Sequence, residues 1–376
     1  MTDTADVVIV GGGIAGAALA YFLGPLGAAR VVLLEREAQP GVHATGRSAA
    51  VLAELDSVPT LTELKVAGGR FLRDPPPDFS ETAVLERSGL LVLLRGAHWD
   101  FLRAALGDLR ALGVTAELLT TAEAVRLVPV LRPEIIDGAA FLPDDGRLDV
   151  HALLTSYLRR ARATGTVTRW QATVTAVLRE GARCAGVRTE RGDVVRARWV
   201  VNAAGAWAAE IGHLAGALPI PLVPHRRTIA LFDPPGGLDA RGWPFVSCDQ
   251  DGVYFSPESG GVLVSPMDED PMPPHDARPD ERRVAEAFDK LGRVAPALVP
   301  RHVRRSWAGL RTFAPDRVPV VGEDPTRPGF FWLAGQGGCG IETSPILGRV
   351  AADLITTGRT TAFDAARLAP ARFAAE

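Results

Sequence analysis

The first 35 residues contain the pattern that most limits what this chain can fold into. The apolar run Val7-Val-Ile-Val10 is followed by glycines at positions 11, 13 and 16 and by an Ala- and Leu-rich stretch. A second apolar run, Val31-Val-Leu-Leu34, comes next. Short apolar runs of this kind are typical of strands buried on both faces of a parallel sheet. Residues 7–35 therefore predict a β-α-β unit within an α/β fold.

Each part of this motif suits a dinucleotide ligand. Gly11 permits the tight turn after the strand, Gly13 lets the backbone approach a pyrophosphate, and Gly16 lets the helix pack closely. The helix N-terminus supplies N–H donors and a positive potential. Glu35 ends the second strand, where its carboxylate accepts both ribose hydroxyls and disfavours a 2′-phosphate. We therefore favour a dinucleotide site over a structural Gly-rich turn, and this unit by itself fits either FAD or NAD.

A second glycine-rich segment, Gly335–Thr343, lies between the apolar run 330–334 and an expected helix over 344–356. A helix N-terminus at this point suits the negative pole of a flavin, near N1 and C2=O. The alternative for this segment alone is a structural turn. Two glycine-rich helix starts at opposite ends of the chain are hard to explain with NAD, but they suit the two ends of FAD. The pair predicts FAD as the cofactor.

Two further segments are less specific. The loop from Glu35 to Ala50 is rich in Gly, Ser and Thr, and it contains Arg47. Such a loop suits a pyrophosphate and a ribityl chain, although its composition also fits an ordinary surface loop. The segment Val201–Trp207 is expected to end a strand beside the adenine and ribose, or to serve packing alone.

Arginines in the middle and late part of the chain offer an anion site. Arg226 and Arg227 are consecutive on an expected strand, so their side chains point to opposite faces and at most one reaches a ligand. Arg311 is a third candidate. A guanidinium pairs with a carboxylate through two parallel hydrogen bonds. Because a single arginine is normally solvated, the interpretation of these residues depends on the resemblance given below.

The composition excludes several classes of protein. A length of 376 residues favours two domains. The net charge of −3 (41 − 44) gives no reason to expect nucleic acid or an anionic membrane as a partner. Three scattered cysteines predict neither a disulfide framework nor a metal site. Since the sequence has neither an apolar run of about 18 residues nor a secretory signal, we expect a soluble, cytoplasmic protein without a transmembrane segment.

The two glycine-rich segments are separated by β-rich material. Strands are expected at 222–231, 252–255 and 262–264, as in an antiparallel sheet, and another at 167–178. We expect a discontinuous Rossmann-like FAD-binding domain with an inserted α+β substrate-binding domain. The FAD-binding domain is assigned to residues 1–57, 140–215 and 305–376, and the substrate-binding domain to residues 58–139 and 216–304. The C-terminal residues are expected to be loosely attached.

Several longer motifs resemble the D-amino-acid oxidase and glycine oxidase superfamily, and most closely bacterial D-arginine dehydrogenase. They are Glu35-Arg-Glu-Ala-Gln-Pro-Gly41, Thr45-Gly-Arg-Ser-Ala-Ala50, Asn202-Ala-Ala-Gly-Ala-Trp207, Trp307-Ala-Gly-Leu-Arg311, Gly329-Phe-Phe-Trp332 and Gln336-Gly-Gly-x-Gly-Ile341. The resemblance covers nearly the whole chain. It implies that FAD is bound non-covalently and that a D-amino acid is oxidised at its Cα–N bond. The imino acid would then hydrolyse to a 2-oxo acid and ammonia.

The resemblance also implies roles for single residues. Arg227 and Arg311 would hold the substrate carboxylate, and Tyr254 would donate a further hydrogen bond. The Gly338 carbonyl would accept from the substrate amine. This arrangement orients Cα–H towards flavin N5 for hydride transfer. The residues expected to contact FAD are Gly11, Gly13, Ile14, Ala15, Gly16, Glu35, Arg36, Thr45, Arg47, Ser48, Ala49, Ala50, Val174, Ala203, Ala204, Gly205, Trp207, Arg311, Gly337, Gly338, Gly340, Ile341, Glu342 and Thr343.

The sequence departs from the arginine enzyme in the pocket for the substrate side chain. Val51 and Asp56 stand where that enzyme has a His and a Tyr, and Leu90 stands where it has a Glu for the guanidinium. Cys339 and Glu342 replace an aromatic residue and a Gln. Leu90 favours a more apolar substrate, whereas Asp56 or Glu342 would receive a cation or have an exposed structural role.

Three functions fit these observations. The first is a D-amino-acid dehydrogenase or oxidase, with oxygen, a quinone or another acceptor. The second is oxidation of glycine, sarcosine, a cyclic or N-substituted amino acid, or a pathway-specific amine. The third is a flavoprotein without turnover of its own. The expected carboxylate clamp, formed by Arg227 and Arg311, argues against this function, because a non-catalytic flavoprotein needs no such clamp. His43 and His225 are candidate proton acceptors, although a structural role is favoured for each.

Overall fold

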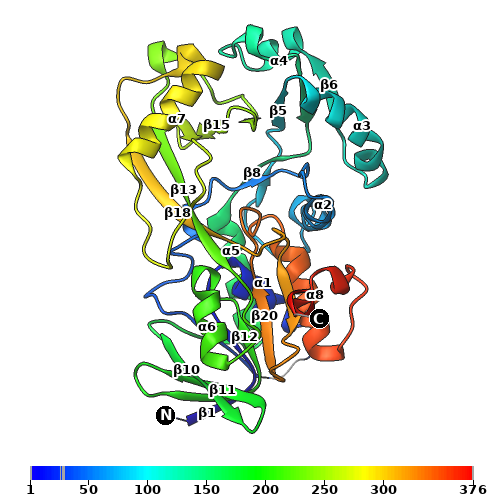
Figure 1. Cartoon of the computed structure of the whole chain (residues 1–376), viewed down its shortest axis with the longest axis vertical. Helices are drawn as coiled ribbons and strands as arrows, with labels where there is room; N and C mark the ends of the chain where they lie inside the picture. The colour runs from blue at the N-terminus through cyan, green and yellow to red at the C-terminus, as the bar shows by residue number, and fades with distance from the viewer. Residues whose placement is uncertain (1, 26, 28–29, 375–376) are drawn as a thin grey trace.

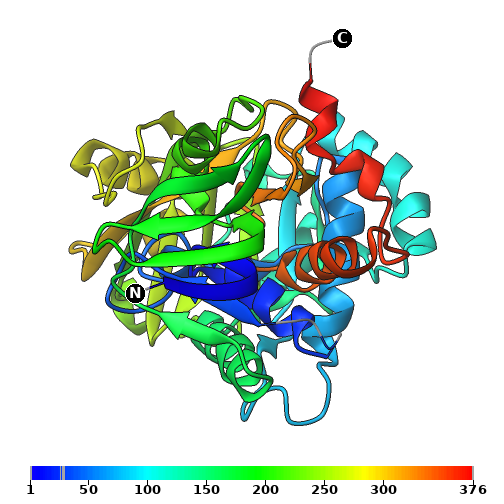
Figure 2. The same cartoon turned by 90° about the horizontal axis from the view of Figure 1, so that it is seen from below.

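The computed structural model describes residues 2–25, 27 and 30–374. These residues form a first large sheet of eight strands in the order β10-β11-β12-β1-β2-β9, in which β20 joins β12 and β19 joins β20. The strands are β1 (Thr2–Val10), β2 (Val31–Leu34), β9 (Val167–Arg169), β10 (Val174–Glu180), β11 (Arg183–Thr189), β12 (Val194–Asn202), β19 (Val320–Glu323) and β20 (Phe330–Ala334). Figure 2 shows β1 beside the green strands of this sheet, and β1 pairs in parallel with both β2 and β12.

The predicted β-α-β unit consists of β1, α1 (Ile14–Leu23) and β2. Val7 and Ile9 of β1 pack in the cluster that contains α1, α5 (Val150–Ala163) and α8 (Ser344–Thr357). Val8 packs in a cluster on the other face with α6 (Ala208–Ala215). Because alternate residues of a strand point to opposite faces, the uninterrupted apolar run reflects burial on both sides.

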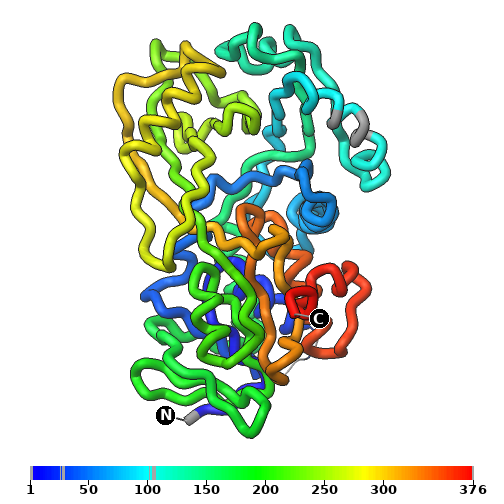
Figure 3. The backbone as a smooth tube through the Cα atoms, in the orientation of Figure 1, coloured from blue at the N-terminus to red at the C-terminus, as the bar shows by residue number. Residues whose placement is uncertain are grey.

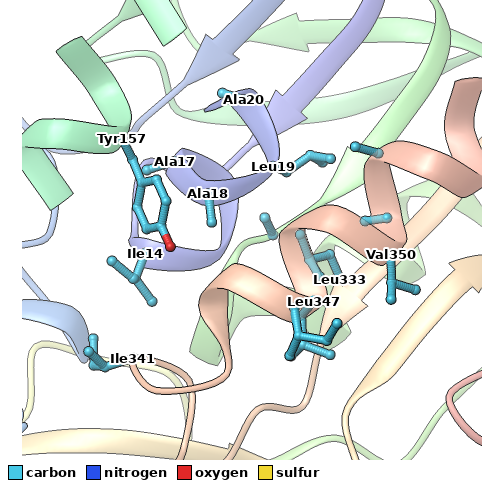
Figure 4. Close-up of a cluster of buried hydrophobic side chains, with 14 of the residues drawn as sticks. Ile14, Ala17, Ala18, Leu19, Ala20, Tyr157, Leu333, Ile341, Leu347 and Val350 are labelled. Atoms are coloured by element: carbon cyan, nitrogen blue, oxygen red, sulfur yellow. The ribbon is translucent and has the colours of Figure 1, made fainter. Parts of the chain in front are cut away.

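The two helices that follow the glycine-rich segments pack directly on each other. Figure 4 shows α1, with Ala18, beside α8, with Leu347 and Val350, whereas Ala17 lies next to Tyr157 of α5. Small residues allow this approach, since a Cβ at Gly348 would lie 3.0 Å from the Ala18 carbonyl carbon. The contact brings the N-terminal ends of α1 and α8 to the same side of the core.

The second large sheet has nine strands in the described residues, in the order β17-β13-β16-β15-β14-β5-β7-β6, with β18 paired to β13. They are β5 (Leu90–Leu94), β6 (Glu117–Thr120), β7 (Gly138–Leu142), β13 (Val223–Phe232), β14 (Phe245–Cys248), β15 (Val253–Glu258), β16 (Gly261–Ser265), β17 (Asp270–Pro271) and β18 (Arg305–Phe313). Figure 1 shows the long strands β13 and β18 running from the half of the molecule with the first sheet towards the half with β15 and α7.

The remaining elements lie around and between the sheets. The helices α3 (Ala97–Ala111), α4 (Thr121–Leu127) and α7 (Glu281–Val294) accompany the second sheet. A small sheet combines β3 (Val51–Leu52), β8 (Gly146–Leu148) and β4 (Leu85–Glu86). In Figure 3 the blue helix α2 (Pro59–Arg73) lies at mid-height of the molecule, between the two large sheets. Strands and loops near α2 therefore connect the half of the molecule that contains the first sheet with the half that contains the second.

The mixed α/β prediction is confirmed, two local expectations are wrong, and one strand lies where none was expected. The strand expected over 167–178 is two strands, β9 and β10, because the chain turns at Gln171, which has a φ of 53°. Residues 305–313 form a strand that local pattern did not predict, because its apolar residues are interrupted by Arg and Gly. The C-terminal segment is held firmly, since Leu368 is fully buried and its carbonyl accepts from Val321 N at 2.9 Å. The domain boundaries stay a prediction.

Candidate functional site

Three cavities lie end to end between the turn after β1 and the second sheet. The first, of about 180 Å³, is lined by Glu35 and Trp207. The middle one, of about 120 Å³, shares Gly13 with the first. The third, of about 590 Å³, shares Gly338 and Ile341 with the middle one. The shared residues join the cavities into one elongated space, which suits a ligand with two distant ends.

The turn between β1 and α1 depends on its glycines. Gly11 has a φ of 116°, and a Cβ there would lie 2.2 Å from the Ala203 carbonyl oxygen. A Cβ at Gly16 would lie 2.0 Å from the Gly11 carbonyl oxygen, so α1 packs against the turn only with glycine there. Gly13 gives α1 no side-chain cap. The first turn of the helix therefore has N–H groups to offer to an anion in the cavity.

Glu35 ends β2 as predicted and is only 8% exposed. Its Oε2 accepts from Gly12 N at 2.7 Å, and its Oε1 accepts from Glu37 N at 2.9 Å. Trp207 forms the neighbouring wall, with the Arg36 guanidinium 4.5 Å from its ring centre. This fixed carboxylate and aromatic face form a compact end of the elongated space.

The sequence suggests that the Arg47 guanidinium contacts the FAD pyrophosphate, but in the structure it contacts other protein groups. Its Nε donates to the Val42 carbonyl at 3.0 Å, and its Nη1 donates to the Ala277 carbonyl at 2.7 Å. Its Nη2 pairs with Asp276. Although Arg47 lines the cavities, its guanidinium connects the loop after β2 with the segment after β17.

The arginine pair on neighbouring strands forms one wall of the third cavity, which is called the largest cavity below because it is the largest of these three. Arg227 on β13 lies opposite Gly309 on β18, and Arg311 lies two residues further along the same face. Arg226 points away, as strand alternation predicts, and pairs with Asp270 at 2.6 Å. The sheet therefore brings Arg227 and Arg311 together and excludes Arg226.

These two guanidiniums carry more positive charge than their surroundings balance. Burial and the neighbouring charge of Arg311 lower the pKa of Arg227 to about 10. Arg227 Nη2 contacts Glu269 at 2.9 Å, and the same carboxylate also contacts Arg317 at 2.9 Å. In the described part of the chain Arg311 makes no ion pair. The cavity wall thus favours an anionic group.

Tyr254 on β15 reaches the same cavity and is only 5% exposed. Its ring packs against Phe245, with the ring centres 5.1 Å apart. Among the described residues, no group forms a hydrogen bond with its hydroxyl. A buried hydroxyl without a partner is costly, by about 1–3 kcal/mol, and a ligand atom that accepted from it would remove this cost.

A buried lysine, which the sequence analysis did not identify, contacts two acidic residues of the same cavity. Lys65 on α2 is 6% exposed, and its Nζ lies 2.7 Å from Asp56 and 3.4 Å from Glu342. The expectation of an exposed role for Glu342 is wrong, since this residue is 5% exposed. The cation that these carboxylates receive is Lys65. A sequence signal existed, because Lys65 follows Leu61 by four residues on the apolar face of α2.

The rest of the largest cavity is mainly apolar. Leu90 lines it, as expected from the substitution at this position. The other apolar side chains of the wall include Leu55, Val92, Leu94, Phe245 and Met267. The wall with Arg227 and Arg311 is therefore adjacent to an apolar surface.

Nearly all the residues expected at the site line one of the three cavities. The exceptions are Gly16, which packs α1 on its turn, and Thr343, whose hydroxyl donates to the Cys339 carbonyl at 2.8 Å. His43 lines the first cavity and contacts Glu37, whereas His225 contacts the Val223 carbonyl outside all three. Neither histidine lines the largest cavity.

Two structural features are absent from the described residues. Across residues 2–25, 27 and 30–374, no helix is both long and apolar enough to cross a membrane. The same part of the chain contains no group of three or more His, Cys, Asp or Glu residues able to hold a metal ion.

Known proteins resemble this chain over almost its entire length. The FAD-dependent oxidoreductase (DAO) family matches residues 6–354. The hydrogen cyanide synthase subunit HcnC of Pseudomonas aeruginosa is 28% identical, over 100% of this chain and 98% of its own. Glycine oxidase of Geobacillus kaustophilus is 28% identical, over 97% of this chain and 96% of its own. The crystal structure of L-proline dehydrogenase from P. horikoshii has a TM-score of 0.90 at 25% identity, covering 99% of this chain and 98% of that one.

The elongated space between two glycine-rich helix starts agrees with these matches, because FAD has two distant ends to hold. The chain therefore belongs to the DAO family of FAD-dependent oxidoreductases, and its cofactor is FAD.

Proposed function

We propose that the protein oxidises the Cα–N bond of a D-amino acid, giving an imino acid that hydrolyses to a 2-oxo acid and ammonia. The observation that carries this proposal is the unpaired, buried hydroxyl of Tyr254 in the cavity that Arg227 and Arg311 line. A hydroxyl donor beside two guanidiniums suits a carboxylate, which accepts from all three. A carboxylate is the group that every amino acid carries next to the bond to be oxidised.

In this proposal the chain positions the substrate. Arg227 and Arg311 hold its carboxylate, Tyr254 donates a third hydrogen bond, and the Gly338 carbonyl accepts from its amine. A Cβ at Gly338 would lie 2.8 Å from Arg311 Nη1, so a larger residue at this position would displace the arginine side chain. FAD, bound without a covalent bond, supplies the acceptor for the hydride from Cα. Holding Cα–H in one orientation lowers the entropic part of the barrier.

The same proposal places FAD along the elongated space. Its adenosine would lie between Glu35 and Trp207, its pyrophosphate at the N-terminus of α1, and its flavin near the turn before α8. We propose an apolar side chain for the substrate, because Leu90, Val92 and their neighbours line the largest cavity.

A second candidate is the oxidation of glycine, or of an amino acid that is cyclic or substituted on its nitrogen, such as proline or sarcosine. It is favoured by the similarity to a glycine oxidase and to an L-proline dehydrogenase, since proline is a cyclic, secondary amine. The carboxylate clamp serves both candidates equally, so the substrate panel must contain glycine, sarcosine and proline as well as D-amino acids.

Anaerobic bleaching of the flavin absorbance tests the proposal. We expect a D-amino acid with an apolar side chain to bleach the holoenzyme, and glycine, sarcosine or proline to do so more slowly. Faster bleaching by the latter group would support the second candidate. No bleaching with any member of the panel would contradict both and would indicate a flavoprotein without this turnover.

Replacing Arg311 separates substrate binding from cofactor binding. Arg311→Met keeps a side chain of similar length but removes the charge, so we expect FAD to stay bound while the rate of flavin reduction falls at least 100-fold, equivalent to about 3 kcal/mol. Arg304→Met, on the exposed stretch before β18, is the matched control. An unchanged reduction rate in Arg311→Met would overturn the assignment of the clamp.

A further inference from the structure

Two parts of the chain that are distant in the sequence meet at one buried charged cluster, which we call the Lys65 cluster (Asp56, Lys65 and Glu342). Lys65 comes from α2, Asp56 from the loop before it, and Glu342 from the turn before α8. The Oε2 of Glu342 also accepts from Ala53 N at 2.7 Å. All three members line the largest cavity. Asp56 has the most accessible side chain, at 20%, against 8% and 6% for the other two.

The cluster contains two carboxyl groups and one amine. With all three ionised it has one surplus negative charge in a buried place, where an unbalanced charge is costly. Taking up one proton removes that surplus. Burial raises the pKa of Glu342 to about 7, although Lys65 opposes this shift. Burial disfavours the charge of Lys65, but the two carboxylates outweigh this effect and raise its pKa.

Other titratable groups near Glu342 do not supply the missing positive charge. Cys339, in the same turn, stays a thiol because burial raises its pKa to about 12. Asp145, before the small sheet, supplies no positive charge either, and burial raises its pKa well above the ordinary value. Its one cationic partner, Arg73, is shared with the buried Glu54. The neighbourhood therefore reinforces proton uptake by the Lys65 cluster.

The cluster and the carboxylate clamp lie at the two ends of one short turn. Gly338 is adjacent to Arg311, and Glu342 follows Gly338 by four residues. Four residues span at most about 14 Å even when fully extended. The unpaired hydroxyl of Tyr254 independently marks the same cavity as a ligand site.

We propose that the Lys65 cluster accepts the proton that the substrate ammonium group loses before oxidation. This inference rests on the proposed function. The N–H bond breaks, its electron pair stays on nitrogen, and the proton enters at Asp56 and is held within the cluster on the Glu342 carboxylate. The nitrogen lone pair then forms the C=N bond as the hydride, with its two electrons, leaves Cα for the FAD that the family uses. Asp56 and Glu342 are thus proton-holding residues, and Lys65 positions them.

The test is the pH dependence of the limiting rate of anaerobic flavin reduction, measured at saturating substrate in the holoenzyme. If the cluster must be unprotonated to accept a proton, the rate rises roughly tenfold between pH 6 and pH 8. In Glu342→Gln this rise should shrink to less than about twofold. Glu63→Gln is the matched control, because Glu63 lies on the same helix but pairs with Arg367 at 2.6 Å, outside the cavity. It should keep the wild-type profile.

A second measurement needs no turnover. Infrared difference spectra of the holoenzyme between pH 6 and pH 8 should contain a band of a protonated carboxylic acid that decreases as pH rises. This band should be smaller in Glu342→Gln than in the wild type, because the buried carboxyl groups of Asp145 and Glu54 contribute equally to both spectra. A holoenzyme that is reduced at a rate independent of pH, without such a band, would overturn the proton-accepting role and leave the proposed function intact. An enzyme that shows the band but is reduced by no amine would instead contradict the proposed function, and with it the role that rests on it.

Discussion

At the level of single residues, Tyr254 combines a well-packed ring with a polar group that costs stability. Its hydroxyl is buried without a partner, whereas its ring packs well against Phe245. An unsatisfied buried donor costs about 1–3 kcal/mol. Such groups persist where a ligand completes them, and they mark functional positions better than exposed arginines do.

Tyr254→Phe should therefore separate stability from binding. The ring and its packing remain while the unpaired hydroxyl is lost, so the thermal midpoint of the substrate-free holoenzyme should stay the same or rise by up to about 3 °C. The KM of the substrate should increase by about tenfold, the loss of one hydrogen bond to a charged group. Differential scanning calorimetry and steady-state kinetics measure the two effects. A clear fall in the thermal midpoint would mean that the hydroxyl has a structural partner.

At the level of elements, the contact between α1 and α8 determines how the two glycine-rich segments are placed. Each segment is recognisable locally, but only the packing of Ala18 and Gly348 brings the helix starts to one side of the core (Figure 4). The strand pair β13 and β18 does the same for Arg227 and Arg311. Local patterns therefore identify the parts of the site, and element packing assembles them.

Gly348→Val should weaken both the fold and the grip on FAD. A Cβ at this position already lies 3.0 Å from Ala18 and Phe22, so the larger side chain must push the helices apart at a cost of about 1–3 kcal/mol. We expect a lower thermal midpoint and a lower ratio of FAD to protein after gel filtration. Arg349→Ala, at the next and exposed position, should change stability by no more than about 0.5 kcal/mol. Equal FAD content in both variants would argue against this coupling.

At the level of the whole molecule, buried ionisable groups lie where the halves meet. Asp145 and Glu54 share one arginine, Arg73, whose Nη2 is 2.6 Å from Glu54 and 3.5 Å from Asp145. Burial raises the pKa of both carboxyl groups above the ordinary range. Their segments connect β3 and β8 of the small sheet with α2. The connection between the halves is therefore sensitive to pH.

The sign of this effect follows from proton linkage. A carboxyl group with a raised pKa in the folded state holds a proton that the unfolded chain releases above about pH 4, so its contribution to stability falls as pH rises from that point. Asp145→Asn removes this penalty, and the Oδ1 of asparagine can still accept from Glu54 N. The gain in thermal midpoint over wild type should increase from pH 5 to pH 8. Asp144→Asn, at the exposed neighbouring position, should show no such trend, and a gain independent of pH in Asp145→Asn would contradict the argument.

The sequence by itself determined the dinucleotide-binding unit. Gly11, Gly16 and Glu35 are recognisable because they depend on backbone conformation, close approach and strand period, which are local properties. The family and its cofactor followed from motifs of the same local kind. The tertiary structure alone decided that Arg47 bonds to the Ala277 carbonyl and that Lys65 contacts Glu342 as well as Asp56, because such contacts depend on distances between segments far apart in the chain.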